Sequence, residues 1–161
     1  MNEGPASQSN IQSLNVTLDI IEHLANVDHA GVTELADAAG VTKSTAHAHL
    51  ATLANRNYVV NEDGLYKLGM RFLRLGRTLQ QNEPLYSIAK DEVDELIDEI
   101  GERAQVMVRE GNAGAHVYRT TGDRAITTDS DVGTNVHLHA TASGKAYLSC
   151  MADDEIESII E

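Results

Sequence analysis

The chain has 161 residues, 42% of them hydrophobic, so it can bury a core and does not have the composition of a disordered chain. Its single cysteine excludes a disulfide framework and a cysteine-rich zinc site, and no apolar run is long enough to span a membrane. The first ten residues are polar and lack the apolar stretch of a secretory signal. We therefore expect a cytoplasmic protein that has no membrane partner.

Acidic residues dominate the charge and are unevenly placed along the chain. Lys and Arg number 12 against 25 Asp and Glu, a net charge of −13. Residues 1–80 carry 6 bases and 8 acids, whereas residues 81–161 carry 6 bases and 17 acids. This asymmetry indicates two modules with different partners. The scarcity of lysine and the excess of carboxylates, which bind water strongly, indicate a halophilic source; an ordinary acidic bacterial protein is the alternative.

Apolar residues recur at every third or fourth position after residue 10, which predicts an amphipathic helix that ends near Asp28. The stripe expected to face the core consists of Ile11, Leu14, Leu18, Ile21 and Leu24.

Two short helices are predicted next. Thr33 is expected to cap a helix over residues 34–39, and Gly40 is expected to end it because glycine tolerates a left-handed conformation. Thr42 then caps a third helix over residues 43–56, whose buried stripe is Ala46, Leu50 and Leu53.

Two apolar runs, residues 58–60 and 65–68, flank an Asp63-Gly64 pair, a strong signal for a β-hairpin. Two short helices joined by a glycine-containing turn and followed by a hairpin are typical of a winged helix-turn-helix. We expect this domain to cover residues 11–69, after a flexible segment over residues 1–10.

The third helix of such a domain lies in the major groove of duplex DNA. Hydroxyl and imidazole groups hydrogen-bond to base edges, a lysine reaches guanine or phosphate, and the amides at the helix start favour a phosphate. The predicted DNA-binding residues are Thr33, Thr42, Lys43, Ser44, Thr45, His47, Ala48, His49 and, in the wing, Lys67. The alternative is a winged-helix protein-interaction module without direct DNA contact, which the acidic net charge favours.

The second half combines helices with strands. A linker helix is expected within residues 70–83, and Pro84 is expected to begin a helix with solvated acids and an inward face of Leu85, Ile88, Val93, Leu96 and Ile100. Strands follow over 104–110, 115–121 and 124–128, then a loop over 129–135 and helices over 143–151 and 153–160. The predicted fold class is α+β.

Several motifs resemble the IclR family of bacterial and archaeal transcription regulators. Residues 11–79 resemble its DNA-binding domain in T-E-L-A (33–36), G-V-T-K-S-T-A-H (40–47), L-A-T-L (50–53) and Y-K-L-G (66–69). The run L-H-A-T-A-S-G-K-A-Y-L (138–148) is similar to the opening of that family's effector domain. With the acidic composition, the resemblance suggests a member from a halophilic archaeon.

The resemblance implies a GAF-like α/β effector domain over residues 84–161 that binds a small metabolite, an organic acid, through Ala142 and Ser143. It also implies a homodimer or tetramer, joined through the DNA-binding half and the linker helix. The apolar linker residues would be Met70, Phe72, Leu73, Leu75 and Leu79.

Two departures from the family pattern stand out. Ala48 occupies a position where the family commonly has an arginine, so the operator sequence does not carry over from relatives. The family's effector domain also continues well past the position of Glu161, so residues 84–161 are expected to be its first part, in a truncated chain.

Other chemistry finds little support in the sequence. The run 143–146 lacks the glycine and the hydroxyl residue that a phosphate-binding loop needs, and the pair His137 and His139 lacks further metal ligands. No Ser-His-Asp or Cys-His arrangement can be assembled. We therefore predict no enzyme, metal or cofactor, and a DNA-binding transcription regulator that responds to a small-molecule effector.

Overall fold

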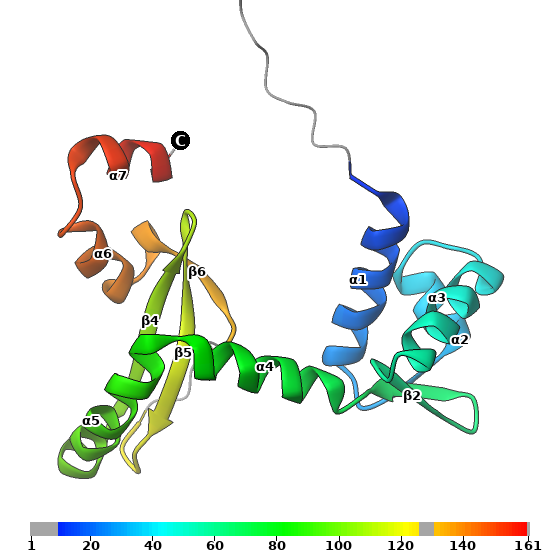
Figure 1. The fold of residues 1–161 in the computed structure, drawn as a ribbon, viewed down its shortest axis with the longest axis horizontal. Coiled ribbons are helices and arrows are strands. Elements are labelled where there is room, and N and C mark those ends of the chain that lie inside the picture. Colours follow the sequence, from blue (N-terminus) through cyan, green and yellow to red (C-terminus); the bar gives the residue numbers. More distant parts are fainter. Residues whose placement is uncertain (1–9, 126–130, 161) are drawn as a thin grey trace, which may run out of the picture. The chain divides into compact units, whose positions relative to one another are not determined.

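A computed structural model describes residues 10–125 and 131–160 and has the α+β fold that the sequence predicts (Figure 1). The chain divides into two compact units, Met1–Gly76 and Arg77–Glu161, called here the N-terminal and C-terminal units. None of the helices in the described ranges is both long and apolar enough to cross a membrane.

The N-terminal unit is a helical domain with a small sheet at its edge. Its elements are α1 (Gln12–Ala25), β1 (Ala30–Gly31), α2 (Val32–Ala38), α3 (Lys43–Asn55), β2 (Val59–Glu62) and β3 (Leu65–Leu68), followed by the start of α4 (Arg71–Asn82). The strands pair antiparallel in the order β1-β3-β2. Asp63 and Gly64 form the hairpin turn at φ 52° and 88°, which confirms the predicted wing.

The turn between α2 and α3 is fixed by backbone hydrogen bonds. Gly40, at φ 63°, donates to the Asp37 carbonyl at 3.2 Å, and the amide of Val41 donates to the Ala36 carbonyl at 2.9 Å. This pair of bonds is a Schellman motif, so the predicted helix end at Gly40 is confirmed. The prediction that Thr33 caps α2 is wrong, because β1 keeps the backbone extended up to Gly31 and Gly31 is the N-cap.

The core of the N-terminal unit confirms the predicted stripe of α3 and corrects that of α1. On α1 the buried side chains are Val16, Ile20 and Leu24, whereas Ile11, Leu14 and Leu18 are 53% to 60% exposed. Helix α1 has two apolar faces, and periodicity alone does not say which of them meets the core. The principal members of the core are Val16, Ile20, Leu24, Ala30, Leu35, Leu50, Leu53, Val59 and Tyr66.

The C-terminal unit packs helices against a second antiparallel sheet. Its elements are α5 (Pro84–Ile100), β4 (Arg103–Glu110), β5 (Ala113–Thr121), β6 (Asn135–His137), the 3₁₀ helix η1 (Leu138–Ala140), α6 (Ala142–Leu148) and α7 (Asp153–Ile160). The strand order is β4-β5-β6. The predicted hairpin is confirmed, but Arg124 and Ala125 lie in a turn, and the remainder of the strand predicted over 124–128 falls outside the described residues. Among the described residues, the third strand of this sheet is β6.

The face with which helix α5 meets the sheet was predicted only in part. Ile97 is buried and Val93 is half-buried, whereas Leu85, Ile88, Leu96 and Ile100 are exposed. Asp94, predicted to be solvated, accepts a hydrogen bond from the Tyr118 hydroxyl of β5, and its Oδ2 lies 2.6 Å from Lys90 Nζ. A polar contact therefore helps to hold α5 on the sheet.

Candidate functional site

The polar residues predicted to read DNA gather on the exposed side of α3. Lys43, Ser44, Thr45 and His47 are exposed, and so is Ala48. The buried residues of the same helix, Ala46, Leu50 and Leu53, pack into the core. The structure thus presents the first turns of α3 to solvent while the opposite side of the helix packs into the core.

Thr42 organises the first turn of this helix. Its hydroxyl accepts a hydrogen bond from the Thr45 amide at 3.2 Å, which confirms the predicted N-cap. Thr42 Oγ1 also lies 3.0 Å from Ser44 Oγ and 2.9 Å from Thr45 Oγ1. Three hydroxyls carry three protons, and two O···O contacts use two of them, so one O–H stays available to a ligand. The cap therefore fixes the positions of two predicted base-reading hydroxyls.

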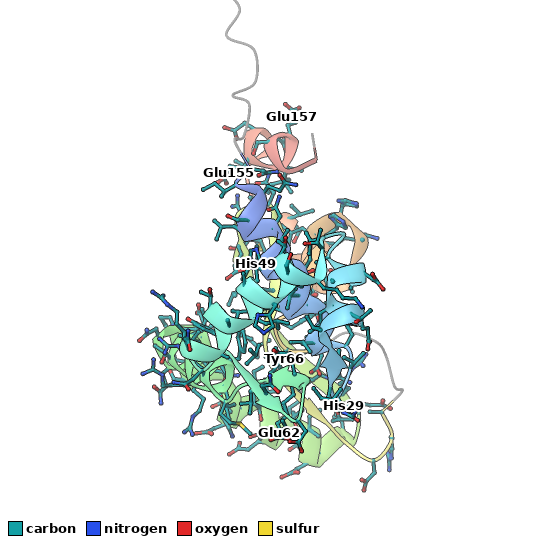
Figure 2. All side chains as sticks on the ribbon, turned by 90° about the vertical axis from the view of Figure 1, so that its right-hand side faces the viewer. His29, His49, Glu62, Tyr66, Glu155 and Glu157 are labelled. Atoms are coloured by element: carbon teal, nitrogen blue, oxygen red, sulfur yellow. The ribbon has the colours of Figure 1, made fainter. Side chains whose placement is uncertain are left out.

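The two histidines of α3 have different surroundings. His47 is exposed, whereas His49 is half-buried on the side of α3 that faces α1, with its Nδ1 2.8 Å from Thr17 Oγ1 (His49 is labelled in Figure 2). His49 also lines an open pocket of about 550 Å³ between α1 and the start of α3, whose lining is Gln12, Ser13, Val16, Gly40, Val41, Thr42, Thr45 and His49. His49 therefore differs from the other predicted DNA-binding residues of α3, which are exposed, because it is half-buried and contacts α1.

The wing carries its own counterion. Lys67 Nζ lies 2.6 Å from Glu62 Oε1, across the hairpin that Tyr66 anchors in the core (Glu62 and Tyr66 are labelled in Figure 2). The Lys67 side chain is 44% exposed and that of Glu62 is 62% exposed, so water screens this ion pair; it contributes little to stability but partly neutralises Lys67. Thr33 is exposed in the first turn of α2.

The residues predicted to contact an effector lie at the start of α6. Thr141 caps this helix by accepting from the Gly144 amide at 3.0 Å. Ser143 is half-buried with its Oγ 3.5 Å from Met107 Sδ of β4, whereas Ala142 is exposed. Ser143 therefore lies against the sheet.

Two buried polar groups on the same sheet were not singled out from the sequence. His116 of β5 is 2% exposed and stands opposite Met107 in the strand register. Within the described part of the chain, His116 Nδ1 and Gln105 Oε1 are buried without a hydrogen-bond partner. A β-bulge interrupts the pairing between Val106 and Met107, but its extra residue, Val117, lies on β5. Alternation along β4 therefore continues, and Gln105 and Met107 share one face with His116. The sequence signal that could have indicated this buried polar group is a histidine within the apolar run of β5.

Burial lowers the pKa of His116, and the positive charges of Arg103 and Arg119 lower it further. The folded chain therefore resists protonation that the unfolded chain accepts below about pH 6.5. We expect the free energy of unfolding to fall as the pH drops from 7 to 5, by up to about 1.4 kcal/mol per pH unit.

Urea unfolding at several pH values measures this dependence. His116→Leu should flatten it over that range. If the free energy of unfolding depends on pH equally in wild type and in His116→Leu, burial of His116 is not the source of the pH dependence.

His137 and His139 are the pair considered from the sequence as metal ligands. The rings of His137 and His139 stack with centroids 5.3 Å apart. Over residues 10–125 and 131–160, no three or more His, Cys, Asp or Glu side chains gather as metal ligands do.

Known proteins match both halves of the chain in the same order. Residues 13–63 match the IclR helix-turn-helix domain, and residues 78–161 match the bacterial transcriptional regulator IclR C-terminal domain. The HTH-type transcriptional regulator XynR of Escherichia coli is 27% identical over 154 residues, which cover 94% of this chain and 61% of XynR. The chain thus spans about three fifths of the length of that relative.

Solved structures agree in fold. The IclR protein of Thermotoga maritima matches 94% of this chain and 62% of its own, with a TM-score of 0.77 at 22% identity. An IclR homolog from Microbacterium hydrocarbonoxydans, complexed with 4-hydroxybenzoate, matches 92% of this chain and 62% of its own, with a TM-score of 0.72 at 21% identity. The chain matches the helix-turn-helix domain and the C-terminal domain of one family, in the order in which that family has them. It therefore belongs to the IclR family of transcriptional regulators.

Proposed function

We propose that this chain binds duplex DNA in a sequence-specific manner through α3 and regulates transcription in response to a small-molecule effector. The observation that carries this proposal is the polar first turn of α3, exposed on a helix-turn-helix unit and held in place by the Thr42 cap. Residues 11–69 would form the DNA-binding domain, 70–83 the linker, and 84–161 would belong to the effector domain. The protein would act in the cytoplasm without catalytic activity.

The proposed DNA contacts fall into two groups, those to base edges and those to the phosphate backbone. Lys43, Ser44, Thr45 and His47 would face base edges, where hydroxyl and imidazole groups discriminate between bases. The small Ala48 would allow close approach to a thymine methyl group. Thr33, Thr42 and Lys67 would contact the phosphate backbone.

Removing one hydroxyl from α3 tests this assignment. We expect Thr45→Ala to weaken binding to a duplex that the wild-type chain selects from a random-sequence pool, because a base-edge hydrogen bond is lost. Thr52→Ala is the matched control, since Thr52 is an exposed threonine of the same helix, two turns further on. Titrations in low and in molar KCl measure both variants.

Each result of that titration is decisive. If Thr45→Ala binds as tightly as Thr52→Ala, the role of Thr45 is refuted. If the wild-type chain selects no duplex, the DNA-binding proposal fails and a protein-interaction module becomes the better reading. Binding that persists in molar KCl would support the halophilic origin, because counterion release then contributes little.

We propose that the effector is an organic acid bound near Ala142 and Ser143. The position of Ser143 against β4 supports this site, and a homolog of the same fold is complexed with an aromatic acid, 4-hydroxybenzoate. Acids of this class can be screened by their effect on the DNA titration, with Ser143→Ala as the variant that should lose the response.

The exposed apolar faces support a homodimer, with a tetramer as the larger possibility. Leu14 and Leu18 of α1 are more than half exposed, as are Leu73 and Leu79 of α4. Large apolar side chains exposed on a helix in this way are typical of association sites. We expect light scattering to give a dimer mass for the chain and a monomer mass for Leu14→Glu, while Asn15→Glu, an equal charge on an exposed neighbour, stays dimeric. A dimeric Leu14→Glu would exclude this face.

A further inference from the structure

We propose that His49 is a positioning residue for DNA recognition: it donates a hydrogen bond from Nδ1 to Thr17 and thereby fixes the rotation of α3 against α1. The inference rests on the proposed DNA-binding function and reassigns His49 from a base contact to a support. The two residues are 32 positions apart in the chain, both are half-buried, and Nδ1 lies 2.8 Å from Thr17 Oγ1.

The number of hydrogens available on Thr17 decides which group donates in the bond between Thr17 and His49. The Thr17 hydroxyl donates its one hydrogen to the Ser13 carbonyl at 2.9 Å, an i to i−4 bond within α1. Thr17 Oγ1 can then only accept from the imidazole, so His49 must carry a proton on Nδ1. The neutral Nδ1–H tautomer and the imidazolium both satisfy this condition, so protonation of Nε2 does not break the bond.

The location of the bond explains what it would control. Apolar contacts hold Ala46, Leu50 and Leu53 in the core, but such contacts have little directional preference. The hydrogen bond is directional and lies one helical turn after Thr45, on the side of α3 that lines the pocket beside α1. It therefore limits the rotation of α3 about its own axis, and with it the direction of the base-reading side chains.

Conservative variants separate a positioning role from direct reading of DNA. The amide nitrogen of asparagine can take the place of Nδ1, whereas that of glutamine takes the place of Nε2, so His49→Asn keeps the donor to Thr17 and His49→Gln does not. Thr17→Val removes the acceptor without changing the shape of the side chain and lies outside the recognition helix. Thr52→Val is the matched control, because Thr52 makes the same i to i−4 bond, to Ala48, at 2.9 Å.

The affinities of these variants are measured on a duplex selected by the wild-type chain and on a scrambled duplex, at a temperature where circular dichroism shows every variant folded. We expect Thr17→Val and His49→Ala each to bind the selected duplex about fivefold more weakly, the worth of one hydrogen bond, with little change on the scrambled one. The double variant should be no worse than either single one, and His49→Asn and Thr52→Val should bind like wild type.

Three results would overturn the proposal. One is unchanged affinity in Thr17→Val. Another is full affinity in His49→Gln together with a loss in His49→Asn, which would make His49 a direct reader through Nε2. The last is an Nε2–H tautomer in the ¹⁵N NMR spectrum of the free chain, where we expect Nδ1–H. If the wild-type chain selects no duplex, the DNA-binding proposal itself fails, and the tautomer still shows whether the bond to Thr17 exists.

Discussion

Replacing Gly144 with alanine is expected to lower the free energy of unfolding of the C-terminal unit by about 3 kcal/mol or more. A Cβ atom at this position would lie 2.1 Å from the carbonyl oxygen of Leu138 and 2.5 Å from its Cα. These are backbone atoms, so no side-chain rotation relieves the overlap. Leu138 is itself fully buried, which means that α6 and η1 must separate to make room.

Helix propensity makes the prediction more specific. Inside a helix, alanine is favoured over glycine by about 1 kcal/mol, so a loss of stability at Gly144 would have to come from the contact with Leu138. Gly76→Ala in α4 is the matched control, because nothing lies within 4 Å of a Cβ built there. Urea unfolding should show destabilisation in Gly144→Ala and equal or higher stability in Gly76→Ala.

The same variant tests the position of the effector residues. Because Ser143 precedes Gly144, displacement of α6 should also move Ser143 away from Met107 and weaken any response to an organic acid. Wild-type stability in Gly144→Ala would show that η1 and α6 do not pack as the structure has them.

The elements predicted well from the sequence are those whose signals are local. Thr42, Gly40 and the Asp63-Gly64 turn each act within a few residues of chain, through a cap, a left-handed helix end and a tight hairpin. Together they delimit α3 and the wing. For this reason the helix-turn-helix and its exposed polar residues could be placed before the structure was known.

The errors concern choices that depend on distant parts of the chain. Helix α1 offers one apolar face with Leu14 and another with Ile20, and the packing of α2 and α3 selects the second. Helix α5 likewise turns Ile97 inward and leaves Ile88 outside, in an orientation that also brings Asp94 to Tyr118 of β5. Periodicity gives the spacing of apolar residues but not the surface that they meet.

The polar groups beside the candidate effector site were missed for a related reason. Gln105 and His116 lie on different strands, and only the register of β4 against β5 brings them to one face. The bond between His49 and Thr17 has the same origin, since it joins two helices whose separation in the chain gives no signal. Sequence reasoning therefore placed the exposed polar residues of α3 more readily than the contacts that support the helix.

Introducing a positive charge on α3, by Ala48→Arg, is expected to raise the affinity for a selected duplex about tenfold at low salt. Ala48 is exposed next to His47, so a long side chain there can extend without meeting the core. The guanidinium presents a fork of donors that suits guanine or phosphate. The net charge of −13 and the pairing of Lys67 with Glu62 leave the wild-type surface poor in cations, so one added charge has a large relative effect.

The salt dependence separates charge from added bulk. One further phosphate contact should steepen the slope of log affinity against log salt concentration by about 0.9, whereas Ala48→Gln, of comparable size but uncharged, should leave the slope unchanged. The gain of Ala48→Arg must therefore shrink as KCl approaches molar concentrations, where the Debye length falls to about 3 Å. If Ala48→Arg binds no more tightly than Ala48→Gln at low salt, position 48 does not face the nucleic acid, and the docking of α3 into the major groove would have to be revised.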